Sequence, residues 1–542
     1  MTIVLPELPA AWAWTTVEEI GSSRDQAVLT GPFGTSMGSG DFVPDGGGAI
    51  PVLTIGCLRD TGLDLRKAVF VRPEKAAELH RYRLRRGDIL FSRMATVGRA
   101  GFVEGRHDGS LFNYHIMRLR LRDDAIDPAL FIYFVRGSDV VRDYVRDVNH
   151  GMTRDGINTE QLLTMPVPLP PRSAQASIVA EIESHGSRLD AAVASLERAQ
   201  AKLNAYRASV LKAAVEGRLV PTEAELARKE KRDYEPADVL LRRILAERRR
   251  RWEQAELAKL IAAGKPPKDD KWKAKYEEPT PPDTTALPAL PTGWVWARAE
   301  QVSEFITKGT TPDTAKMNAG DGEVPFIKVY NLTFEGTLDC SVAPTFISKE
   351  TNDNELARST CLPGDVLMNI VGPPLGKVSI VPATLPRWNI NQAIARYRPL
   401  DGLIARFLAY VLLGPDAVAW AMRRAKTTAG QVNLTLEIAR DLPIALPPYA
   451  EQVRVTAALD QQLSTHAREC ETVTKGVLRV ARLRQSILKW AFEGKLVDQD
   501  PNDEPAEKLL ARIRAERAAA PSTRKPRGSK ENGVVRSGRG ST

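Results

Sequence analysis

The chain has 542 residues, 43% of them hydrophobic and 26% charged, with a formal net charge of +9. This length predicts several domains with ample core, and the composition is ordinary for a water-soluble protein. No apolar run approaches the ~18–20 residues that a membrane-spanning helix needs, and we expect no signal peptide. The cysteines, none of which form a CxxC pair, argue against zinc or disulfide frameworks and for a reducing cytoplasm; they are Cys57, Cys340, Cys361 and Cys470.

Each half of the chain opens with short β-type runs separated by Gly, Pro and Asp, followed by a helical stretch. Landmarks recur in the same order in both halves. In the first half they are Trp12-Ala13-Trp14, Ile50-Pro51-Val52-Leu53, Gly87-Asp88-Ile89-Leu90 and a helix near Pro128–Val148. In the second half they are Trp294-Val295-Trp296, Val324-Pro325-Phe326-Ile327, Gly364-Asp365-Val366-Leu367 and a helix near Ile404–Arg424. We therefore expect two mixed α/β globules of about 160 residues each.

A long helical pattern follows each globule. The first copy opens at Leu169-Pro170-Pro171 and ends at Glu216–Val220; the second opens at Leu446-Pro447-Pro448 and ends at Glu493–Val497, 277 residues later at both ends. A prolyl pair breaks the preceding structure, and a glycine stands where a helix needs a left-handed C-terminal residue. The sequence thus predicts two helices of equal length.

Apolar residues in both helical patterns follow gaps of four and three, which is typical of a coiled-coil seam. In the first copy they are Ile178, Ile182, His185, Leu189, Ala192, Leu196, Ala199, Leu203, Tyr206, Val210 and Ala213. In the second copy, with two shifts of register, they are Val455, Leu459, Leu463, His466, Cys470, Val473, Val477, Val480, Leu483, Ile487 and Trp490. We expect the two helices to pack on each other as an antiparallel coiled coil.

A further helix is predicted after each long one, starting at Glu235-Pro236-Ala237 and at Glu504-Pro505-Ala506. The first of these continues through Arg248–Arg251 to about Ala263, and a charged, proline-rich linker then leads to the second globule. The arginine run is interpreted as a solvated helix face, with DNA contact as the alternative. The tail from Pro521 is basic and is interpreted as disordered, with a non-specific arm for phosphates as the alternative.

Motifs of covalent chemistry are incomplete wherever they are suggested. Leu446-Pro447-Pro448-Tyr449 lacks the Asn, Asp or Ser that an amino-methyltransferase motif uses to accept a hydrogen bond. Gly372–Val378 has one residue too few between glycines for a phosphate loop, and no Ser or Thr follows Lys377. His185 and His466 lie on helical seams, where a structural role is favoured. We expect no catalysis and no metal site in this chain.

This repeated order of motifs resembles the specificity subunit of a type I restriction–modification enzyme. The resemblance covers almost the whole chain except the basic tail. Leu446-Pro447-Pro448 with Glu451-Gln452 is the family's usual start of the helix, whereas the first copy has Ala174-Gln175 and lacks the glutamate. The Trp-x-Trp openings, the Gly-Asp-[Ile/Val]-Leu turns and the Glu-Gly-[Arg/Lys]-Leu-Val endings also fit.

The resemblance implies that each globule is a target recognition domain that reads one half of a bipartite sequence in double-stranded DNA. It also implies that the paired helices set the distance between the half-sites and dock two modification (methyltransferase) subunits. Those subunits would bind S-adenosylmethionine, and separate restriction/translocase subunits would use ATP. About 35 residues of seam at ~1.5 Å rise give roughly 50 Å, or about 15 base pairs at ~3.4 Å each.

We expect phosphate contacts from Lys and Arg and base contacts from Arg, Asn, Gln, Ser and Thr. The candidates lie in polar loops or beside the repeated turns, where a solvated loop or a structural cap is the alternative for each. They are Thr35, Ser36, Arg93, Arg99, Tyr114 and Arg154 in the first globule, and Lys308, Thr310, Thr311, Lys328, Asn331, Asn391, Gln392, Lys426 and Gln431 in the second.

The predicted domains are a target recognition domain over residues 1–168, a central helical region with linker over 169–285, a second target recognition domain over 286–445, a C-terminal helical region over 446–520 and a basic tail over 521–542. The alternative function is that of a coiled-coil scaffold joining two protein-binding modules. Salt discriminates between them, because a DNA reader loses affinity steeply as salt rises.

Overall fold

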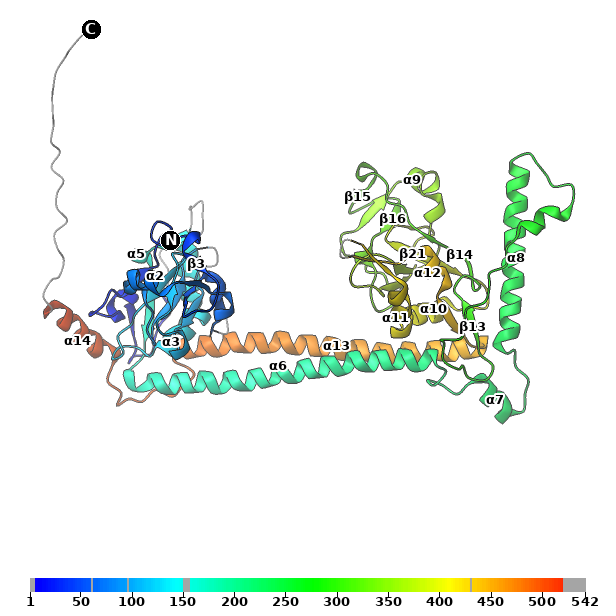
Figure 1. Ribbon diagram of the computed structural model, residues 1–542. Helices are drawn as coiled ribbons and strands as arrows, with labels where there is room; N and C mark the ends of the chain where they lie inside the picture. Colours follow the sequence, from blue (N-terminus) through cyan, green and yellow to red (C-terminus); the bar gives the residue numbers. More distant parts are fainter. Residues whose placement is uncertain (1–4, 60–61, 95–96, 150–155, 429–430, 520–542) are drawn as a thin grey trace, which may run out of the picture. The chain divides into compact units, whose positions relative to one another are not determined.

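The structure, a computed structural model, describes residues 5–59, 62–94, 97–149, 156–428 and 431–519 (Figure 1). Two compact units are distinguished. Unit 1 comprises Met1–Leu196 and Lys475–Thr542, and unit 2 comprises Glu197–Thr474. Each unit therefore contains one α/β module together with one end of each long helix.

The first module lies in unit 1 and is closed by its first and last strands, β1 (Ala13–Thr16) and β12 (Pro166–Leu169), which pair antiparallel. Two four-stranded sheets follow, in the orders β2-β11-β8-β9 and β10-β4-β7-β3. Their strands are β2 (Val28–Thr30), β3 (Phe42–Val43), β4 (Ile50–Leu53), β7 (Val69–Val71), β8 (Ile89–Ser92), β9 (Ala100–Phe102), β10 (Leu111–Phe112) and β11 (Ile116–Leu119). The strands β5 (Leu58–Arg59) and β6 (Gly62–Leu63) pair with each other. The helices are α1 (Val17–Ile20), α2 (Pro73–Glu78), α3 (Pro128–Gly137), α4 (Asp139–Asn149) and α5 (Thr159–Leu163).

The second module lies in unit 2 and repeats this plan. Its first and last strands, β13 (Val295–Arg298) and β24 (Pro443–Leu446), pair antiparallel, and its four-stranded sheets have the orders β14-β21-β18-β19 and β15-β17-β16-β20. Their strands are β14 (Ser303–Lys308), β15 (Asn318–Ala319), β16 (Val324–Ile327), β17 (Thr345–Ile347), β18 (Val366–Asn369), β19 (Val378–Ile380), β20 (Asn389–Ile390) and β21 (Ile394–Pro399). The strands β22 (Lys426–Thr428) and β23 (Gln431–Asn433) pair with each other. The helices are α9 (Lys349–Asp353), α10 (Ala405–Leu413), α11 (Pro415–Arg424) and α12 (Leu436–Asp441).

By strand length, β2-β11-β8-β9 and β14-β21-β18-β19 are the larger sheets of the two modules. One inner strand of each, β8 or β18, is buried on both faces, which explains its continuous apolar sequence. In β8, Ile89 and Phe91 belong to the core under α3, whereas Leu90 belongs to a second core shared with the smaller sheet. In β18, Val366 and Leu367 divide between two cores in the same way. Full burial of such a side chain contributes about 1.5–3 kcal/mol, so the sheet is held between the helices and the smaller sheet.

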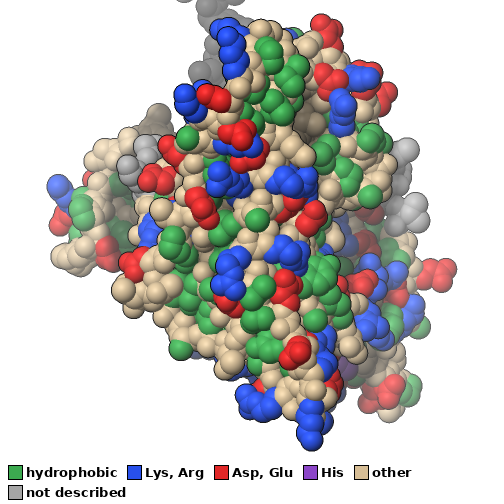
Figure 2. Space-filling view, turned by 90° about the vertical axis from the view of Figure 1, so that its right-hand side faces the viewer, with side chains coloured by type: hydrophobic (Ala, Val, Ile, Leu, Met, Phe, Trp, Pro, Cys, Tyr) green, Lys and Arg blue, Asp and Glu red, His purple; other side chains and the backbone are tan. Residues whose placement is uncertain are grey.

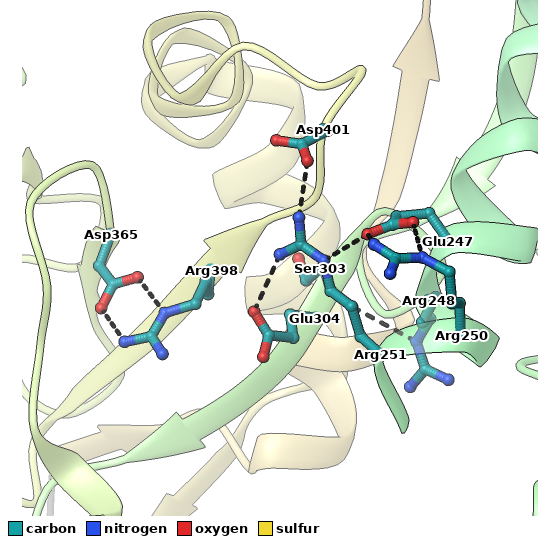
Figure 3. Close-up of polar contacts among 9 residues, drawn as sticks. All are labelled: Glu247, Arg248, Arg250, Arg251, Ser303, Glu304, Asp365, Arg398 and Asp401. Carbon is teal, nitrogen blue, oxygen red and sulfur yellow. Dashed lines mark hydrogen bonds and ion pairs between the residues drawn. The ribbon is translucent and has the colours of Figure 1, made fainter. Parts of the chain in front are cut away.

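The Gly-Asp pair that precedes each of these strands is a buried polar anchor. The Asp88 carboxylate accepts two hydrogen bonds from the Arg120 guanidinium, at 2.7 and 2.8 Å. The Asp365 carboxylate accepts two from Arg398, both at 2.7 Å (Figure 3). Both carboxylates are almost fully buried, so the bidentate arginine supplies the compensation that burial of a charge requires.

The long helices are α6 (Arg172–Val215) and α13 (Tyr449–Phe492), and they pack antiparallel in each unit. In unit 1 the Leu196 side chain lies against Gly476, where an added Cβ would stand 3.1 Å from Leu196 Cδ2. In unit 2 a ring nitrogen of His466 lies 3.1 Å from the Leu203 carbonyl oxygen, and the Tyr206 hydroxyl donates to Gln462 Oε1 at 3.2 Å. The predicted pairing of the two helices is confirmed within each unit.

The predicted seam is less regular than its sequence pattern. Four predicted seam residues are exposed over 39% to 51% of their surface: Tyr206, Val477, Leu483 and Trp490. These four residues are not buried between the helices, although the Tyr206 hydroxyl still contacts Gln462 on the partner helix. Shifts of register interrupt the apolar stripe of the second copy. The α13 residues Leu488 and Ala491, which lie outside the predicted seam, are buried against the first module.

A glutamine fixes the start of each long helix to its module. The Gln175 amide oxygen accepts a hydrogen bond from Asp127 N at 2.7 Å, and its nitrogen donates to the Ala125 carbonyl at 2.9 Å. The Gln452 amide oxygen accepts from Ile404 N at 2.9 Å. These bonds satisfy backbone groups at the start of the module's own helix, α3 or α10, and explain the glutamine after each Leu-Pro-Pro.

The end of each long helix lies against the first tryptophan of a module. In unit 2 an added Cβ on Gly217 would stand 3.1 Å from Trp294, and in unit 1 one on Gly494 would stand 3.5 Å from Trp12. Both glycines have a φ of 67°, the left-handed conformation expected after a helix.

The indole N–H groups of Trp12 and Trp294 donate to different acceptors. The Trp294 indole N–H donates to the buried Glu451 carboxylate at 3.0 Å. The first copy has Ala174 at the position of Glu451, and there the Trp12 indole donates to Gln499 Oε1 at 2.8 Å. The missing glutamate of the first copy is thus replaced by an amide from the other end of the chain.

Three further α-helices are α7 (Glu223–Glu230), α8 (Ala237–Ala262) and α14 (Ala506–Ala519). The α8 helix joins the second module through Ala237 N, which donates to the Gly293 carbonyl, and α14 joins the first module through Ala506 N and the Ala11 carbonyl. Among the described residues, no helix is both long and apolar enough to cross a membrane. Nor do three metal-ligating side chains gather anywhere in that part of the chain.

Candidate nucleic-acid interface

Antiparallel pairing brings one set of loops to the same end of the strands in each larger sheet. In the order β2-β11-β8-β9 the ends of β2 and β8 lie beside the starts of β11 and β9. We call this the loop edge of the first module and define it as residues 31–36, 93, 99 and 113–115. The matching loop edge of the second module comprises residues 309–312, 369–377, 391–393 and the β22–β23 hairpin, whose Val432 carbonyl accepts a hydrogen bond from Gly372 N.

The same backbone frame builds both loop edges. Gly31 N donates to the Ile116 carbonyl at 3.1 Å, and Gly309 N donates to the Ile394 carbonyl at 3.2 Å. An added Cβ would stand 2.2 Å from Asn113 O in the first case and 2.3 Å from Asn391 O in the second. Because backbone cannot yield to such a contact, only glycine fits there.

In both modules an asparagine side chain stabilises the turn that precedes an inner strand, β11 or β21. Asn113 Oδ1 accepts a hydrogen bond from His115 N at 3.2 Å, and Asn391 Oδ1 accepts one from Ala393 N at 3.3 Å. The hydrogen bond to the asparagine side chain thus stabilises the turn. Residues Phe33 and Thr311 therefore occupy equivalent positions, each two after the glycine, and Tyr114 and Gln392 do so one after the asparagine.

The structure brings most of the candidates of the first module to its loop edge. Thr35, Ser36 and Arg99 are exposed, and Arg93 and Tyr114 are half-buried. The Tyr114 ring stacks on Phe33, with centroids 6.0 Å apart and planes inclined by 26°. Arg154 lies outside the described residues.

In the second module, Lys308, Thr310, Thr311 and Gln392 are exposed at the loop edge, and Asn391 is half-buried. The Thr311 hydroxyl donates to the Gln392 amide oxygen. The backbones of Lys426 and Gln431 belong to the β22–β23 hairpin at this edge. The four exposed residues therefore lie at one end of the sheet, where the backbone of the hairpin also lies.

Lys328 and Asn331 lie at the end of β16, next to the loop edge. Asn391 N donates to the Ile327 carbonyl at 3.0 Å, which places Lys328 beside that turn. Asn331 is buried, and its amide nitrogen donates to the Asp339 and Val342 carbonyls at 3.0 and 2.8 Å. The Asn331 side chain holds its own loop together.

Two loop-edge residues escaped the sequence-based selection. Phe33 is 56% exposed, and an aromatic residue after Gly31-Pro32 in an otherwise polar loop was the available indication. Lys377, which precedes β19 as Arg99 precedes β9, is half-buried. Lys377 N donates to Asn369 Oδ1 and Arg99 N donates to Ser92 Oγ, both at 2.9 Å. The sequence alignment of the two halves could have found this basic pair.

Charge at the loop edge of the first module is carried by arginine and not by histidine. Burial and the neighbouring Arg93 guanidinium lower the pKa of His115, whose ring lies 3.9 Å from that of Tyr114 between centroids. At neutral pH the imidazole is therefore uncharged. The positive charge at this edge is therefore carried by Arg93 and Arg99.

Two arginines of the run Arg248–Arg251 on α8, Arg248 and Arg251, contact the second module (Figure 3). The Arg251 guanidinium contacts the carboxylates of Glu247, Glu304 and Asp401 at 2.7, 3.3 and 2.6 Å. Arg248 donates to the Ser303 carbonyl at 3.4 Å, at the end of β14 opposite to the loop edge. On the face of unit 2 in Figure 2, Lys and Arg side chains are interspersed with Asp and Glu, unlike a continuous phosphate-binding surface.

The chain is similar to known proteins over most of its length. A family model described as the type I restriction modification DNA specificity domain matches residues 42–197 and 291–472. The EcoBI specificity subunit of a type I restriction enzyme of Escherichia coli is 26% identical over 424 residues, which cover 76% of each chain. The EcoAI specificity subunit of Escherichia coli is 25% identical over 400 residues, or 64% of this chain and 62% of that protein. A chain in a solved type I R-M system shares the fold with a TM-score of 0.57 and 18% identity, over 91% of this chain and all of that one.

Proposed function

We infer the function of this chain from the premise that it belongs to the type I restriction–modification DNA specificity family, whose model matches most of both modules. The chain provides the DNA sequence specificity of a type I restriction–modification system, as the specificity subunits that resemble it do. It is a recognition subunit and not the catalyst.

We propose that the two loop edges read the two halves of a bipartite target in double-stranded DNA. The observation that carries this proposal is one backbone frame that occurs twice and presents different side chains each time. The frame of Gly31 and Asn113 recurs at Gly309 and Asn391 with the same hydrogen bonds. A fixed frame with exchanged side chains suits base reading, because bases are distinguished by donors, acceptors and methyl groups in the major groove.

Basic side chains at the loop edges supply the attraction to phosphate that base reading needs. Arg99 and Lys377 occupy equivalent positions at the starts of β9 and β19, and Lys308 is exposed at the end of β14. Phosphate contacts position a protein on DNA, and base contacts specify the sequence. The two kinds of contact are therefore available on one surface of each module.

We further propose that the repeated helical regions dock two modification subunits and that restriction/translocase subunits join the complex. On this proposal S-adenosylmethionine and ATP bind to those partners. The duplication of α6 and α13 supports two equivalent docking positions.

The division of labour is tested by methyl transfer. The full chain incubated with duplex DNA and labelled S-adenosylmethionine should transfer no methyl group, and the same chain with its modification subunits should methylate adenines at a split target. Mapping those adenines gives both half-sites and their gap. Methyl transfer by the chain alone would overturn the proposal.

Salt dependence separates DNA reading from the scaffold alternative. Duplex binding by the full chain should weaken steeply between 50 and about 200 mM salt, because each phosphate contact releases a counterion. A chain that binds no duplex at low salt would be a scaffold joining two protein-binding modules.

A further inference from the structure

The two loop edges differ most sharply at one pair of equivalent positions. In the first module the pair is Phe33 and Tyr114, whose rings stack with centroids 6.0 Å apart. In the second module the pair is Thr311 and Gln392, whose side chains share a hydrogen bond. The residues touch each other in both modules, but the contact is aromatic in one and polar in the other.

The equivalence of the positions rests on backbone geometry and not on sequence likeness. Phe33 and Thr311 follow the glycines that lie against the asparagine turn by two residues. Tyr114 and Gln392 follow the turn asparagines by one residue, in turns closed by the same bonds. The frame therefore delivers each pair to the same place relative to its sheet.

Exposure shows that these pairs are not core contacts. Phe33 is 56% exposed, and no buried cluster of the described residues includes it. Thr311 and Gln392 are both exposed. An exposed aromatic stack beside arginines and an exposed amide held by a hydroxyl both contribute little to stability. These side chains are instead accessible for contact with a ligand.

We propose that this pair of positions is the reading pair of each module, and that the two modules read by different chemistry. In the second module Gln392 reads an adenine: its amide nitrogen donates to N7 and its amide oxygen accepts from the N6 amino group, the bidentate pairing open to glutamine in the major groove. The Thr311 hydroxyl occupies one lone pair of the amide oxygen and orients it.

In the first module the aromatic pair reads a thymine through its C5 methyl group. Phe33 presents a ring that offers no hydrogen bond, and apolar contact with the thymine methyl is the major-groove contact such a side chain can make. Tyr114 supports the ring from behind by stacking. This assignment rests on the proposed function and names the base that each loop edge selects.

Base analogues test the assignment on the full chain and the duplex that carries its mapped target. Purine, which lacks the N6 amino group, replaces each adenine of the second module's half-site in turn. At one position it should weaken binding by the wild-type chain by about 5-fold or more, the range for one bidentate contact. Gln392→Ala should bind the natural target more weakly and should show no further loss with purine at that position.

Uracil, which lacks the C5 methyl group, replaces each thymine of the first module's half-site in the same way. Wild-type binding should fall about fourfold at one position, as expected for one buried methyl-sized group. Phe33→Ala should be insensitive to that replacement. Gln254→Ala, at an exposed glutamine on α8, is the matched control and should keep every wild-type sensitivity.

The outcomes separate this inference from the function on which it rests. A wild-type chain that distinguishes no bases in either half-site would overturn the proposed function. A wild-type chain that reads its target, with Gln392→Ala and Phe33→Ala retaining every analogue sensitivity, would leave the function standing and overturn the reading pair. Because the Phe33, Thr311 and Gln392 side chains are exposed, loss of folding does not confuse the result, and circular dichroism confirms it.

Discussion

Glu451 shows how much one buried carboxylate contributes to the start of α13. It accepts hydrogen bonds from the Trp294 indole at 3.0 Å and from Glu223 N at 2.8 Å. Glu451→Ala leaves both donors buried without an acceptor, so the free energy of unfolding should fall by roughly 2–4 kcal/mol. Urea unfolding measures this. Glu437→Ala, at an exposed site on α12, should change it by less than about 0.5 kcal/mol.

A histidine of the first module gives stability a pH dependence. His107 is fully buried, its Nδ1 accepts a hydrogen bond from Glu104 N at 3.1 Å, and burial lowers its pKa below the usual 6.5. As pH falls through 6.5 the unfolded chain binds a proton that the folded chain refuses, so stability should decrease between pH 7.5 and 5.5. His107→Asn keeps an acceptor near Nδ1. Its unfolding midpoint in urea should therefore vary less with pH, and an unchanged slope would show that His107 contributes nothing.

Side-chain roles were the least predictable part of the site. Asn331 is polar and follows a strand, as a base-reading residue does, but its amide holds the loop backbone internally. Phe33 looks like a core residue by type, yet it is exposed. A single sequence gives the residue type and its place along the strand, whereas the loop's own hydrogen bonds decide which way the side chain turns.

At the scale of helices and strands, local rules were more reliable. The Leu-Pro-Pro breaks and the glycines at 217 and 494 predicted both long helices, which begin at Arg172 and Tyr449. The apolar runs after each Gly-Asp became the central strands. The periodicity was less reliable where the seam carried shifts of register, since Leu483 and Trp490 there are exposed.

The contact between α6 and α13 in unit 1 depends on Leu196, which lies over Gly476. Leu196→Asp removes this packing and brings a charge to the helix interface, so the free energy of unfolding should fall by about 1–3 kcal/mol. Leu478→Asp makes the same substitution at a site on α13 that is 55% exposed, and it should be nearly neutral. Equal effects of the two substitutions in urea unfolding would contradict the packing role of Leu196.

For the whole molecule, the proposal of a split target predicts that helix length sets the gap between half-sites. Four residues inserted after Ala199, with four after Glu469 to keep the helices in register, lengthen each helix by ~6 Å. The complex with modification subunits should then methylate the same half-sites with a gap longer by about two base pairs.

Exchange of the first globule, Leu8–Pro168, for that of another family member is the matched experiment. It should change one half-site and leave the gap unaltered. Sequencing of methylated adenines reads both outcomes. An insertion that changes the bases read, or leaves the gap as it was, would mean that the helices do not measure the target.

The indole hydrogen bonds at the helix ends bear on the exchange of one module for another. The first module offers the Trp12 N–H, and Gln499, far along the chain, accepts it; the second offers Trp294 to Glu451. A module from another chain that has a tryptophan at this position can donate to the acceptor that this chain provides, Gln499 or Glu451. We therefore expect that exchange of a module together with its own tryptophan preserves this hydrogen bond at the helix end.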